Sequence, residues 1–453
     1  MPEFAPSALA LAAALLASPV FAPAAVAATM PASVPIEERV GWWHPLGDPA
    51  LSALIARGLA ANLDMAQAQA RIGRSQALLA GARAEFGPRG SAGLAGRAAQ
   101  LSETEAPGLG RGERRAHSVG AALEFSWEVD LFGRLGHQAG AAAHRVQASE
   151  AQLRGARLAV SAEIAHAYFG LIGSREQLEL ARTVAANRER TLRLVAARAA
   201  GGLAAPIDEL RARADLEAAL AEIPVQEAAV RVAMHRLAVL TGESPAGFAL
   251  PTSDTIAPSA IGIPLPESEA WLARRPDVQE FEAELRARAL DVKAVRAEFY
   301  PRFTITGVLG FVAGSVSAIG TGGSLSWLSA PSLLAPLFDR PRIEARLAAA
   351  QADQKEVLAA YRQRLLLATE ELENALARYG AGQQQFQHLQ RRAQLAADAE
   401  RLSRVRYEAG AADLLELLDA QRTAQQAQAA LSVALTQQRQ NLVAVFRGMG
   451  AGA

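Results

Sequence analysis

Acidic pairs, histidines and a glycine-rich segment are the residues of this sequence that could do chemistry. Adjacent carboxylates occur at positions 370–371 and 208–209, but neighbouring side chains splay around a helix and do not converge on one substrate. His137 and His144 share a helix face without a carboxylate at zinc-ligand spacing. The glycine-rich segment 307–323 lacks the Gly-Lys-Ser/Thr ending of a phosphate loop. We therefore expect no enzyme, no metal site and no cofactor.

Composition narrows the class of protein further. The chain has 453 residues, of which 51% are hydrophobic and none is cysteine. Thiol catalysis, thiolate metal sites, disulfides and cysteine-linked lipid are thereby excluded within these residues. The 46 basic residues are balanced by 46 acidic ones, and a nucleic-acid partner would require a surplus of basic residues on one face. We expect a globular or membrane-associated protein that binds no nucleic acid.

The N-terminus predicts export from the cytoplasm. Residues 8–17 form an apolar stretch, and Ala-Val-Ala at 25–27 is a small-x-small cleavage site. We expect a signal peptide over 1–27, although Glu3 and the lack of an early basic residue depart from the usual pattern; a buried N-terminal helix is the alternative. The later apolar stretch 306–338 is interrupted by Gly, Ser and Pro, so a membrane crossing would have to use strands.

The chain contains an internal repeat. The hexamer at 84–89 recurs at 297–302, an offset of 213 residues, and the tetramer at 131–134 recurs at 337–340 with an offset of 206. Gly202 matches Gly410 at an offset of 208. Such self-similarity indicates two structural copies of one architecture. We expect a first repeat over 28–243, a Pro/Ser/Gly-rich linker over 244–266, and a second repeat over 267–453.

Each repeat contains a segment with strand periodicity. From 118 to 131, apolar residues alternate with polar and acidic ones, as in a strand between lipid and a wet interior. We expect hairpins over 89–131 and 302–337, while an ordinary solvated sheet remains the alternative. The aromatic residues expected on the membrane strands are Phe125, Trp127, Phe303, Phe311 and Trp327.

The remaining segments predict very long helices. No proline occurs in 134–198 or 342–453, and a 65-residue helix is roughly 97 Å long at about 1.5 Å per residue. Such rods must pack along one another, and Leu358, Leu365 and Leu372 recur at heptad spacing with small residues between them. Glycines at 201–202 and 410 are C-cap and turn signals, so each long helix is expected to reverse there.

Several motifs, in order, carry a family resemblance. They are Trp-Trp-His-Pro at 42–45, Trp-Glu-Val-Asp-Leu-Phe-Gly-Arg at 127–134, Phe-Tyr-Pro-Arg at 299–302, Arg-Tyr-Glu-Ala-Gly at 406–410 and Leu-Asp-Ala-Gln-Arg at 418–422. From about 40 to 448 the chain resembles TolC-like outer-membrane efflux proteins of the NodT type. The resemblance implies an α+β membrane protein: a homotrimer whose protomers share a transmembrane β-barrel and a long α-helical barrel.

The same resemblance implies the function and the partners. We expect an outer-membrane channel with a periplasmic extension, in contact with outer-membrane lipid and serving as the passive conduit of a tripartite efflux pump for small molecules. Its partners would be a periplasmic adaptor and an inner-membrane pump, which we expect to be proton-driven. Many relatives carry a lipidated N-terminal cysteine, whereas this chain has no cysteine, so no lipid anchor is expected. A conduit for protein secretion, a porin-like channel and an exported coiled-coil scaffold are the alternatives.

Two sets of residues are expected to serve this conduit. Leu415, Asp419 and Arg422 lie at i, i+4 and i+7, on one helix face, and the resemblance implies that they narrow the tunnel tip. Arg422 would pair with acids on a neighbouring helix; coiled-coil packing and surface charge are the alternative reading. The turns at the helix reversals are expected to dock the adaptor, with the residues Gly201, Gly202, Arg406, Tyr407 and Gly410.

Overall fold

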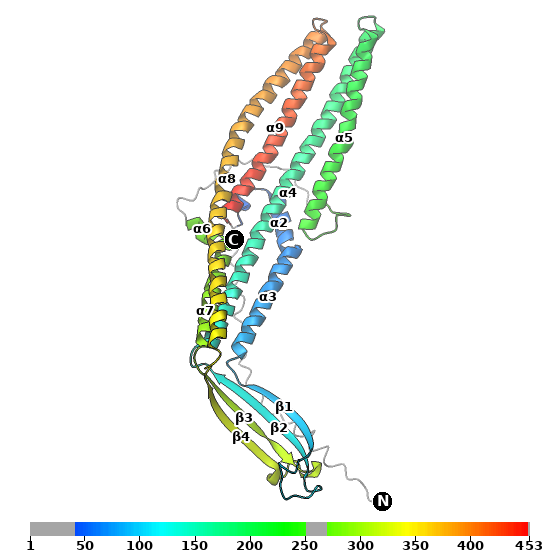
Figure 1. Cartoon of the computed structure of the whole chain (residues 1–453). Helices are drawn as coiled ribbons and strands as arrows, with labels where there is room; N and C mark the ends of the chain where they lie inside the picture. The colour runs from blue at the N-terminus through cyan, green and yellow to red at the C-terminus, as the bar shows by residue number, and fades with distance from the viewer. Residues whose placement is uncertain (1–40, 251–269, 452–453) are drawn as a thin grey trace, which may run out of the picture. The chain divides into compact units, whose positions relative to one another are not determined.

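The computed structural model describes residues 41–250 and 270–451, which fall into two compact units (Figure 1). Within the described residues, the sheet unit comprises 77–143 and 287–354, and the helical unit comprises the rest. The expected signal peptide and much of the expected linker lie outside the described residues. None of the described helices combines the length and the apolar character that a bilayer crossing would need.

The elements follow one another twice in the same order. The helices of the first half are α2 (Pro49–Ala61), α3 (Leu63–Ala84), α4 (Arg134–Ala200) and α5 (Pro206–Leu240), with strands β1 (Arg89–Gln100) and β2 (Arg115–Val129) between α3 and α4. The second half contains α6 (Ala270–Arg274), α7 (Pro276–Ala297), β3 (Arg302–Ala313), β4 (Leu325–Leu334), α8 (Arg340–Glu408) and α9 (Leu414–Gly448). The architecture of long helices plus strands in two repeats confirms the fold class expected from the sequence.

The sheet is antiparallel, with four strands in the order β1-β2-β3-β4. Strands β1 and β3 have 12 residues each and occupy equivalent places in the two repeats. In the register between β2 and β3, Val129 is opposite Phe303 and Phe125 is opposite Gly307. Because side chains alternate between the faces of a strand, this register fixes which residues of all four strands share a face.

The core of the helical unit lies where α2 packs against α4 and α5. Leu51, Leu54 and Ile55 of α2 are fully buried together with Ile164 of α4 and Leu237 of α5. Burial of such side chains stabilises by roughly 1.5–3 kcal/mol each, which holds a short helix against two long ones.

One carboxylate sets the position of α2 in this core. Asp48 accepts hydrogen bonds from the backbone N–H groups of Ala50 and Leu51 at 2.9 and 3.0 Å, capping α2. Its other oxygen accepts from the Tyr168 hydroxyl of α4 at 2.8 Å. The pKa of Tyr168 lies above its usual value. Burial is the largest cause, and the hydrogen bond to Asp48 and the charge of Asp48 add to it. The phenol therefore stays a donor across the physiological pH range.

Small residues bring the long helices of the second repeat close together. Ala427 of α9 is fully buried against Ala393 and Ala396 of α8. Leu372, one of the leucines expected at heptad spacing, and Ala375 of α8 pack against Val445 of α9. Alanine at these positions permits a close approach of the two backbones.

In each repeat, a side chain donates a hydrogen bond to a backbone oxygen at the end of the last helix. We call this contact the clamp of the repeat. In the first repeat, the Asn62 side chain donates to the backbone oxygen of Leu240, at the end of α5, at 2.9 Å. In the second, the Arg275 guanidinium donates to the backbone oxygen of Gly448, at the end of α9, at 2.7 Å. Leu240 and Gly448, whose backbone oxygens accept these hydrogen bonds, are 208 positions apart in the sequence, and so are Gly202 and Gly410. The duplication thus extends to individual hydrogen bonds.

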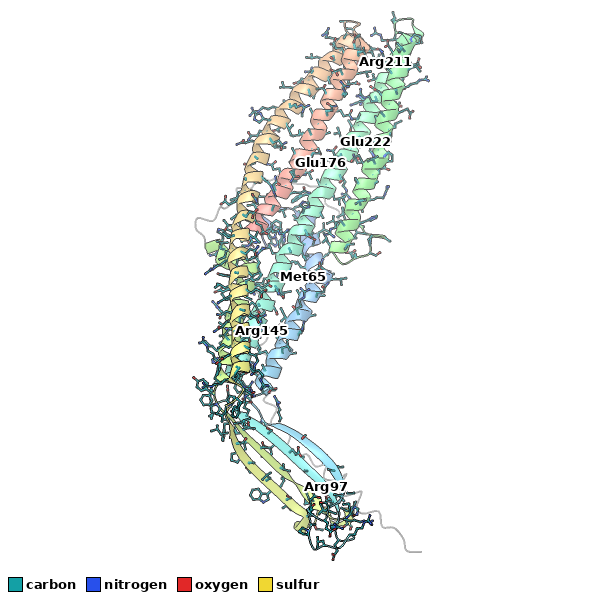
Figure 2. All side chains as sticks on the ribbon, in the orientation of Figure 1. Met65, Arg97, Arg145, Glu176, Arg211 and Glu222 are labelled. Carbon is teal, nitrogen blue, oxygen red and sulfur yellow. The ribbon has the colours of Figure 1, made fainter. Side chains whose placement is uncertain are left out.

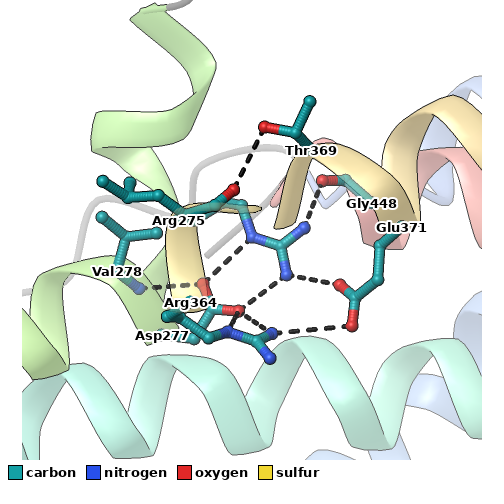
Figure 3. A network of polar contacts seen from close by, with 8 residues as sticks. Arg275, Asp277, Val278, Arg364, Thr369, Glu371 and Gly448 are labelled. Carbon is teal, nitrogen blue, oxygen red and sulfur yellow. Dashed lines mark hydrogen bonds and ion pairs between the residues drawn. The ribbon is translucent and has the colours of Figure 1, made fainter. Parts of the chain in front are cut away.

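The second clamp carries charges that the first lacks (Figure 3). Arg275 pairs with Asp277 and Glu371, each at 2.6 Å, and Arg364 also contacts Asp277. Burial alone raises the pKa of Asp277, but the hydrogen bonds and charges of Arg275 and Arg364 outweigh it, so the pKa lies below its ordinary value. The network ties α7, α8 and α9 together inside the helical unit.

Substitution of Arg275 by methionine is expected to destabilise the helical unit. The change removes the donor to Gly448 and to Glu371, and each lost charge-assisted hydrogen bond costs about 1–3 kcal/mol. Thermal unfolding followed by far-UV circular dichroism should show a lower midpoint than for Arg274→Met, since Arg274 is the exposed neighbour. An equal midpoint for the two variants would contradict this role.

The acid dependence of stability follows from Asp277. A carboxyl whose pKa is lowered in the folded state adds stability that is present above its unfolded pKa of about 3.9 and is lost as the pH falls through the folded pKa. The difference in unfolding midpoint between the parent chain and Arg275→Met should therefore shrink in acid.

Candidate functional site: helix tips and strand faces

The two helix reversals are built on glycines in a left-handed conformation. Gly202 has φ +74° and Gly410 has φ +76°, a region that a residue with a Cβ enters only at a cost. The amide of the next residue donates back into the helix in both turns: Leu203 to Arg198 and Ala411 to Arg406, each at 2.8 Å. This is the hydrogen-bond pattern of a Schellman C-cap. The sequence-predicted reversals therefore exist and have equivalent geometry.

Arg198 and Tyr407 hold the two reversals together. The Arg198 guanidinium lies 4.8 Å from the centre of the Tyr407 ring and donates to the Tyr407 backbone oxygen at 2.5 Å. Tyr407 is only 4% exposed and packs with Val195 and Leu417, and this burial raises its pKa. The ring expected in a docking surface is therefore inside the tip, where it braces the turn.

The other expected docking residues are at the surface. Gly201, Gly202 and Gly410 are exposed. Arg406 is also exposed; it pairs with Glu416 at 3.0 Å and donates to the Ala411 backbone oxygen at 3.2 Å. These residues expose backbone and charge at the ends of the helices.

The three expected gate residues share one exposed face of α9. Leu415 is 53% exposed, and the side chains of Asp419 and Arg422 are 64% and 66% exposed. Arg422 donates to Asp419 on its own helix and not to an acid on a neighbouring helix, as the resemblance had led us to expect. The i, i+3 spacing explains the difference, because the carboxylate one turn away is within immediate reach.

A buried polar cluster beside these residues was not predicted. Arg188 of α4, whose side chain is 8% exposed, donates to Gln421 of α9 and lies 3.8 Å from Asp215 of α5. Gln421 in turn donates to Thr191 of α4 at 3.0 Å. Burial lowers the pKa of Arg188, with the charges of Asp215 and Glu400 opposing this effect. The cluster connects three helices immediately next to Arg422.

The sequence signal for this cluster is weak but recognisable. Arg188 stands in an otherwise apolar helical stripe with Val184, Leu192 and Val195, where a charge is expected only if it has partners. A second polar tie lies further along α4 at Glu176, which accepts from Ser432 and Arg439 of α9 at 3.1 and 3.2 Å (Figure 2). Polar contacts at Arg188 and at Glu176 therefore attach α9 to α4 at two places along α4.

A cavity of about 350 Å³ lies between α4, α5 and α9. Its lining includes Arg188, Asp215, Glu222 and Arg422. Charged groups therefore face the space beside the expected gate, together with apolar residues such as Leu180 and Val184.

The strand register places every expected membrane aromatic on one face of the sheet. Phe125 opposes Gly307, Trp127 opposes Ile305, and Trp327 opposes Leu309. We call this the apolar face; it also carries Ala92 and Leu94 of β1, Ala121 and Leu123 of β2, Phe303 and Phe311 of β3, and Leu325 and Leu333 of β4. The indole N–H of Trp127 donates to the Phe86 backbone oxygen at 2.8 Å. This polar group therefore has a hydrogen-bond acceptor at the end of β2.

The opposite face carries polar and charged side chains beside apolar ones such as Val308 and Leu328. It carries Glu124 and Glu128 of β2, Thr304 and Thr306 of β3, and Arg97 of β1, near the loop end of the sheet (Figure 2). Glu128 binds Arg134 at the start of α4 through two hydrogen bonds of 3.0 and 2.8 Å. A sheet with one apolar face and one charged face matches lipid on one side and water on the other.

Metal binding finds no support in the described part of the chain. Its residues contain no group of three or more His, Asp or Glu side chains placed to hold an ion. His137 and His144, which share a helix face in the sequence, both belong to α4.

The sequence matches known proteins over most of its length. The family model described as outer membrane efflux protein matches residues 54–243 and 268–451. The outer membrane protein OprJ of Pseudomonas aeruginosa is 35% identical over 74% of this chain and 70% of its own length. The probable outer membrane lipoprotein SilC of Salmonella typhimurium is 28% identical over 92% of this chain and 88% of its own length.

A solved structure matches as well. The outer-membrane channel OprN aligns with a TM-score of 0.83 at 31% identity, covering 90% of this chain and 92% of that one. Both repeats are included in the family match, as the internal duplication requires.

The chain belongs to the outer membrane efflux protein family. It is the outer-membrane channel of an efflux pump and not an enzyme, and the TolC-like fold implies a trimeric channel. The family resemblance expected from the sequence motifs is thereby confirmed.

Proposed function

We propose that this chain forms a passive conduit through which an inner-membrane pump, joined by a periplasmic adaptor, expels small toxic molecules or drugs. The observation that carries the proposal is the two-faced sheet together with the paired helical hairpins. The apolar face would meet lipid, with the strands of three protomers closing a barrel, and the helices would extend into the periplasm. The glycine-rich segment 307–323 lacks the Gly-Lys-Ser/Thr ending of a phosphate loop, so the energy for transport would come from the pump.

Export can be tested directly. Deletion of the gene is expected to sensitise cells to several unrelated toxic compounds, and the plasmid-borne gene should restore resistance. A heat-shift gel of outer membranes should show a trimer. Restored resistance with the protein recovered only from the soluble periplasm would contradict a membrane conduit and favour an exported scaffold.

The tip would be the gate of this conduit. Leu415, Asp419 and Arg422 lie on one face of α9, and in a trimer three copies of that face would meet at one opening. The Arg188–Gln421 hydrogen bond supports the closed arrangement, since it holds α9 against α4. Movement of α9 away from α4 would break this bond and widen the tip.

The reversals would be the docking site for the adaptor. Their exposed glycines and Arg406 are at the ends of both long hairpins, and turn residues at a rigid end are accessible to a partner. Tyr407 and Arg198 would act indirectly, by keeping the two turns at a fixed distance.

Valine at position 410 is expected to abolish export without preventing assembly. A β-branched residue at φ +76° costs roughly 1–2 kcal/mol, so the turn should rearrange. Trimers should still reach the outer membrane, but drug resistance and cross-linking to the adaptor should be lost. Ala409→Val is the matched control, because Ala409 is the exposed residue between the end of α8 and Gly410 and does not have a positive φ. Full resistance in the Gly410→Val strain would count against docking at this turn.

Membrane attachment without lipid is also part of the proposal. The relative SilC is described as a probable lipoprotein, whereas none of the 453 residues here can form a thioether, because the sequence contains no cysteine. Labelled palmitate supplied to cells should not enter the protein, while a lipoprotein in the same cells is labelled. Radioactivity in the purified trimer would refute this part.

A further inference from the structure

The apolar face of the sheet ends in basic residues. Along β2, the side chains on this face run from Trp127 to Val119, and the next two on the same face belong to His117 and Arg115. Both residues are exposed. They lie where β2 meets the loop 101–114, at the end of the strand opposite α4. A cationic surface therefore follows directly on the apolar one.

A third basic residue, from the loop, is held beside the same face. Gln100 lies opposite Arg115 in the register of β1 and β2. Its side chain donates to the backbone oxygen of Arg111 at 3.1 Å and accepts from the Arg115 guanidinium at 3.4 Å. Arg111 is exposed as well. We call Arg111, Arg115 and His117 the basic cluster.

The carboxylates of the loop are engaged elsewhere. Glu103 pairs with Arg114 at 3.5 Å, and Glu105 and Glu113 accept hydrogen bonds from other residues of the loop at 2.9 and 2.8 Å. Within residues 41–250 and 270–451, no carboxylate forms an ion pair with the basic cluster. Its positive charge is therefore available to an anionic ligand.

The length of the apolar face indicates where the basic cluster lies in a membrane. Ten residues separate Trp127 from His117, which is roughly 33 Å at about 3.3 Å per residue. In a strand tilted by about 40°, that length covers about 25 Å of membrane thickness, the height of the apolar band of an outer-membrane barrel. With Trp127 at the periplasmic boundary, the basic cluster is at the opposite boundary, level with the headgroups of the outer leaflet.

The chemistry of the basic cluster matches those headgroups. The outer leaflet of an outer membrane consists of glycolipid whose headgroup carries phosphates, and arginine binds phosphate through paired, charge-assisted hydrogen bonds. His117 adds a ring donor. We propose that the basic cluster binds the phosphorylated headgroup of an outer-leaflet glycolipid, whose acyl chains lie against the apolar face. This inference rests on the proposed membrane conduit.

The second repeat has no equivalent cluster. Its loop, 314–324, contains no charged residue, and the first residue of β4 on the apolar face is Leu325. The internal duplication therefore serves as a comparison within one chain. Each protomer has one cluster, in its first repeat.

Lipid binding to purified trimers tests the proposal. Trimers extracted from outer membranes and freed of lipid by detergent exchange are titrated with bis-phosphorylated lipid A, and the dissociation constant is measured by microscale thermophoresis. An arginine next to an anionic lipid surface strengthens binding about 5-fold. Arg115→Gln should therefore weaken binding about 5-fold, and Arg111→Gln with Arg115→Gln roughly 30-fold.

Arg97→Gln is the matched control. Arg97 is an exposed arginine of β1 near the same end of the sheet, but its side chain is on the opposite face, beside Ser118. The variant removes the same charge and should bind lipid A as the parent does. Equal weakening in Arg97→Gln and Arg115→Gln would overturn the proposal, because the net charge of the protein would then explain the binding.

Two further ligands separate the sources of phosphate. Phosphatidylglycerol is anionic but lacks the phosphorylated sugar, so the parent should bind it more weakly than lipid A. Inorganic phosphate should not displace lipid A, because it makes no contact with the apolar face. Equal affinity for phosphatidylglycerol, or full displacement by inorganic phosphate, would overturn the assignment to the glycolipid.

Failure of this site can be told apart from failure of the conduit. Heat-shift gels and drug resistance report on the trimer and on export for each variant. If the double arginine variant forms trimers, confers resistance and binds lipid A as tightly as the parent, the proposed site is wrong while the conduit stands. If the parent chain itself forms no outer-membrane trimer and confers no resistance, the proposed function fails.

Discussion

Combined substitution of Asp419 by alanine and Arg422 by glutamate is expected to open the helix tips and raise single-channel conductance in planar bilayers. The parent side chains form an exposed pair on α9, which contributes only about 0–1 kcal/mol per copy. Three symmetry-related copies act on one opening, however, and the substituted glutamates repel one another. Cells should also become sensitive to large antibiotics that the parent channel excludes.

The matched control is another Asp–Arg ion pair at i, i+3 spacing that does not lie on the α9 face of Leu415, Asp419 and Arg422. Asp398 and Arg401 form an exposed i, i+3 pair on α8 at 3.2 Å, so Asp398→Ala with Arg401→Glu makes the same charge change on another helix. This control should leave conductance and antibiotic sensitivity unchanged. If the α9 variant also behaves like the parent while forming trimers, its residues are surface charge and the constriction lies elsewhere.

Arg188→Leu should open the tip further than the double substitution. Its guanidinium is buried and donates to Gln421 across the α4–α9 contact, and hydrogen bonds to charged groups contribute about 1.5–3 kcal/mol each. The remaining α4–α9 tie at Glu176 should keep the hairpins associated, so the variant should still assemble.

Alanine at position 310 is expected to prevent the sheet from forming and so to eliminate the outer-membrane trimer. A Cβ at Gly310 would lie 2.3 Å from the Ala121 backbone oxygen and 2.6 Å from the Ala122 Cα. Backbone atoms of a paired strand cannot yield without breaking the ladder, and overpacking of this kind costs roughly 1–3 kcal/mol. Heat-shift gels of outer membranes should show little or no trimer.

Gly93→Ala is the control for this substitution. Ala122 lies between Gly93 and Gly310 in the same row of the sheet, but a Cβ at Gly93 would meet nothing within 4 Å. Trimer yield should therefore stay at the parent level. Equal yields for the two variants would show that β2 and β3 are not as closely paired in the membrane as in the structure.

Much of the fold was predictable because its signals are local or repeated. Alternation over residues 118–131, the absence of proline from residues 134–198 and 342–453, and the glycines at 202 and 410 each report backbone preferences that nearby residues enforce. The matching segments at 84–89 and 297–302 then showed that one architecture occurs twice. Those features determine helix, strand and turn, and they determined the family.

The contacts at the tip depended on tertiary structure. Arg188 and Gln421 are 233 positions apart in the sequence. The sequence alone could not reveal that Tyr407 is buried under Arg198, or that Arg422 turns to Asp419 on its own helix. Periodicity specifies which face of a helix is apolar, whereas the partner of a polar side chain depends on the axial alignment of helices, which is set by packing between residues distant in sequence.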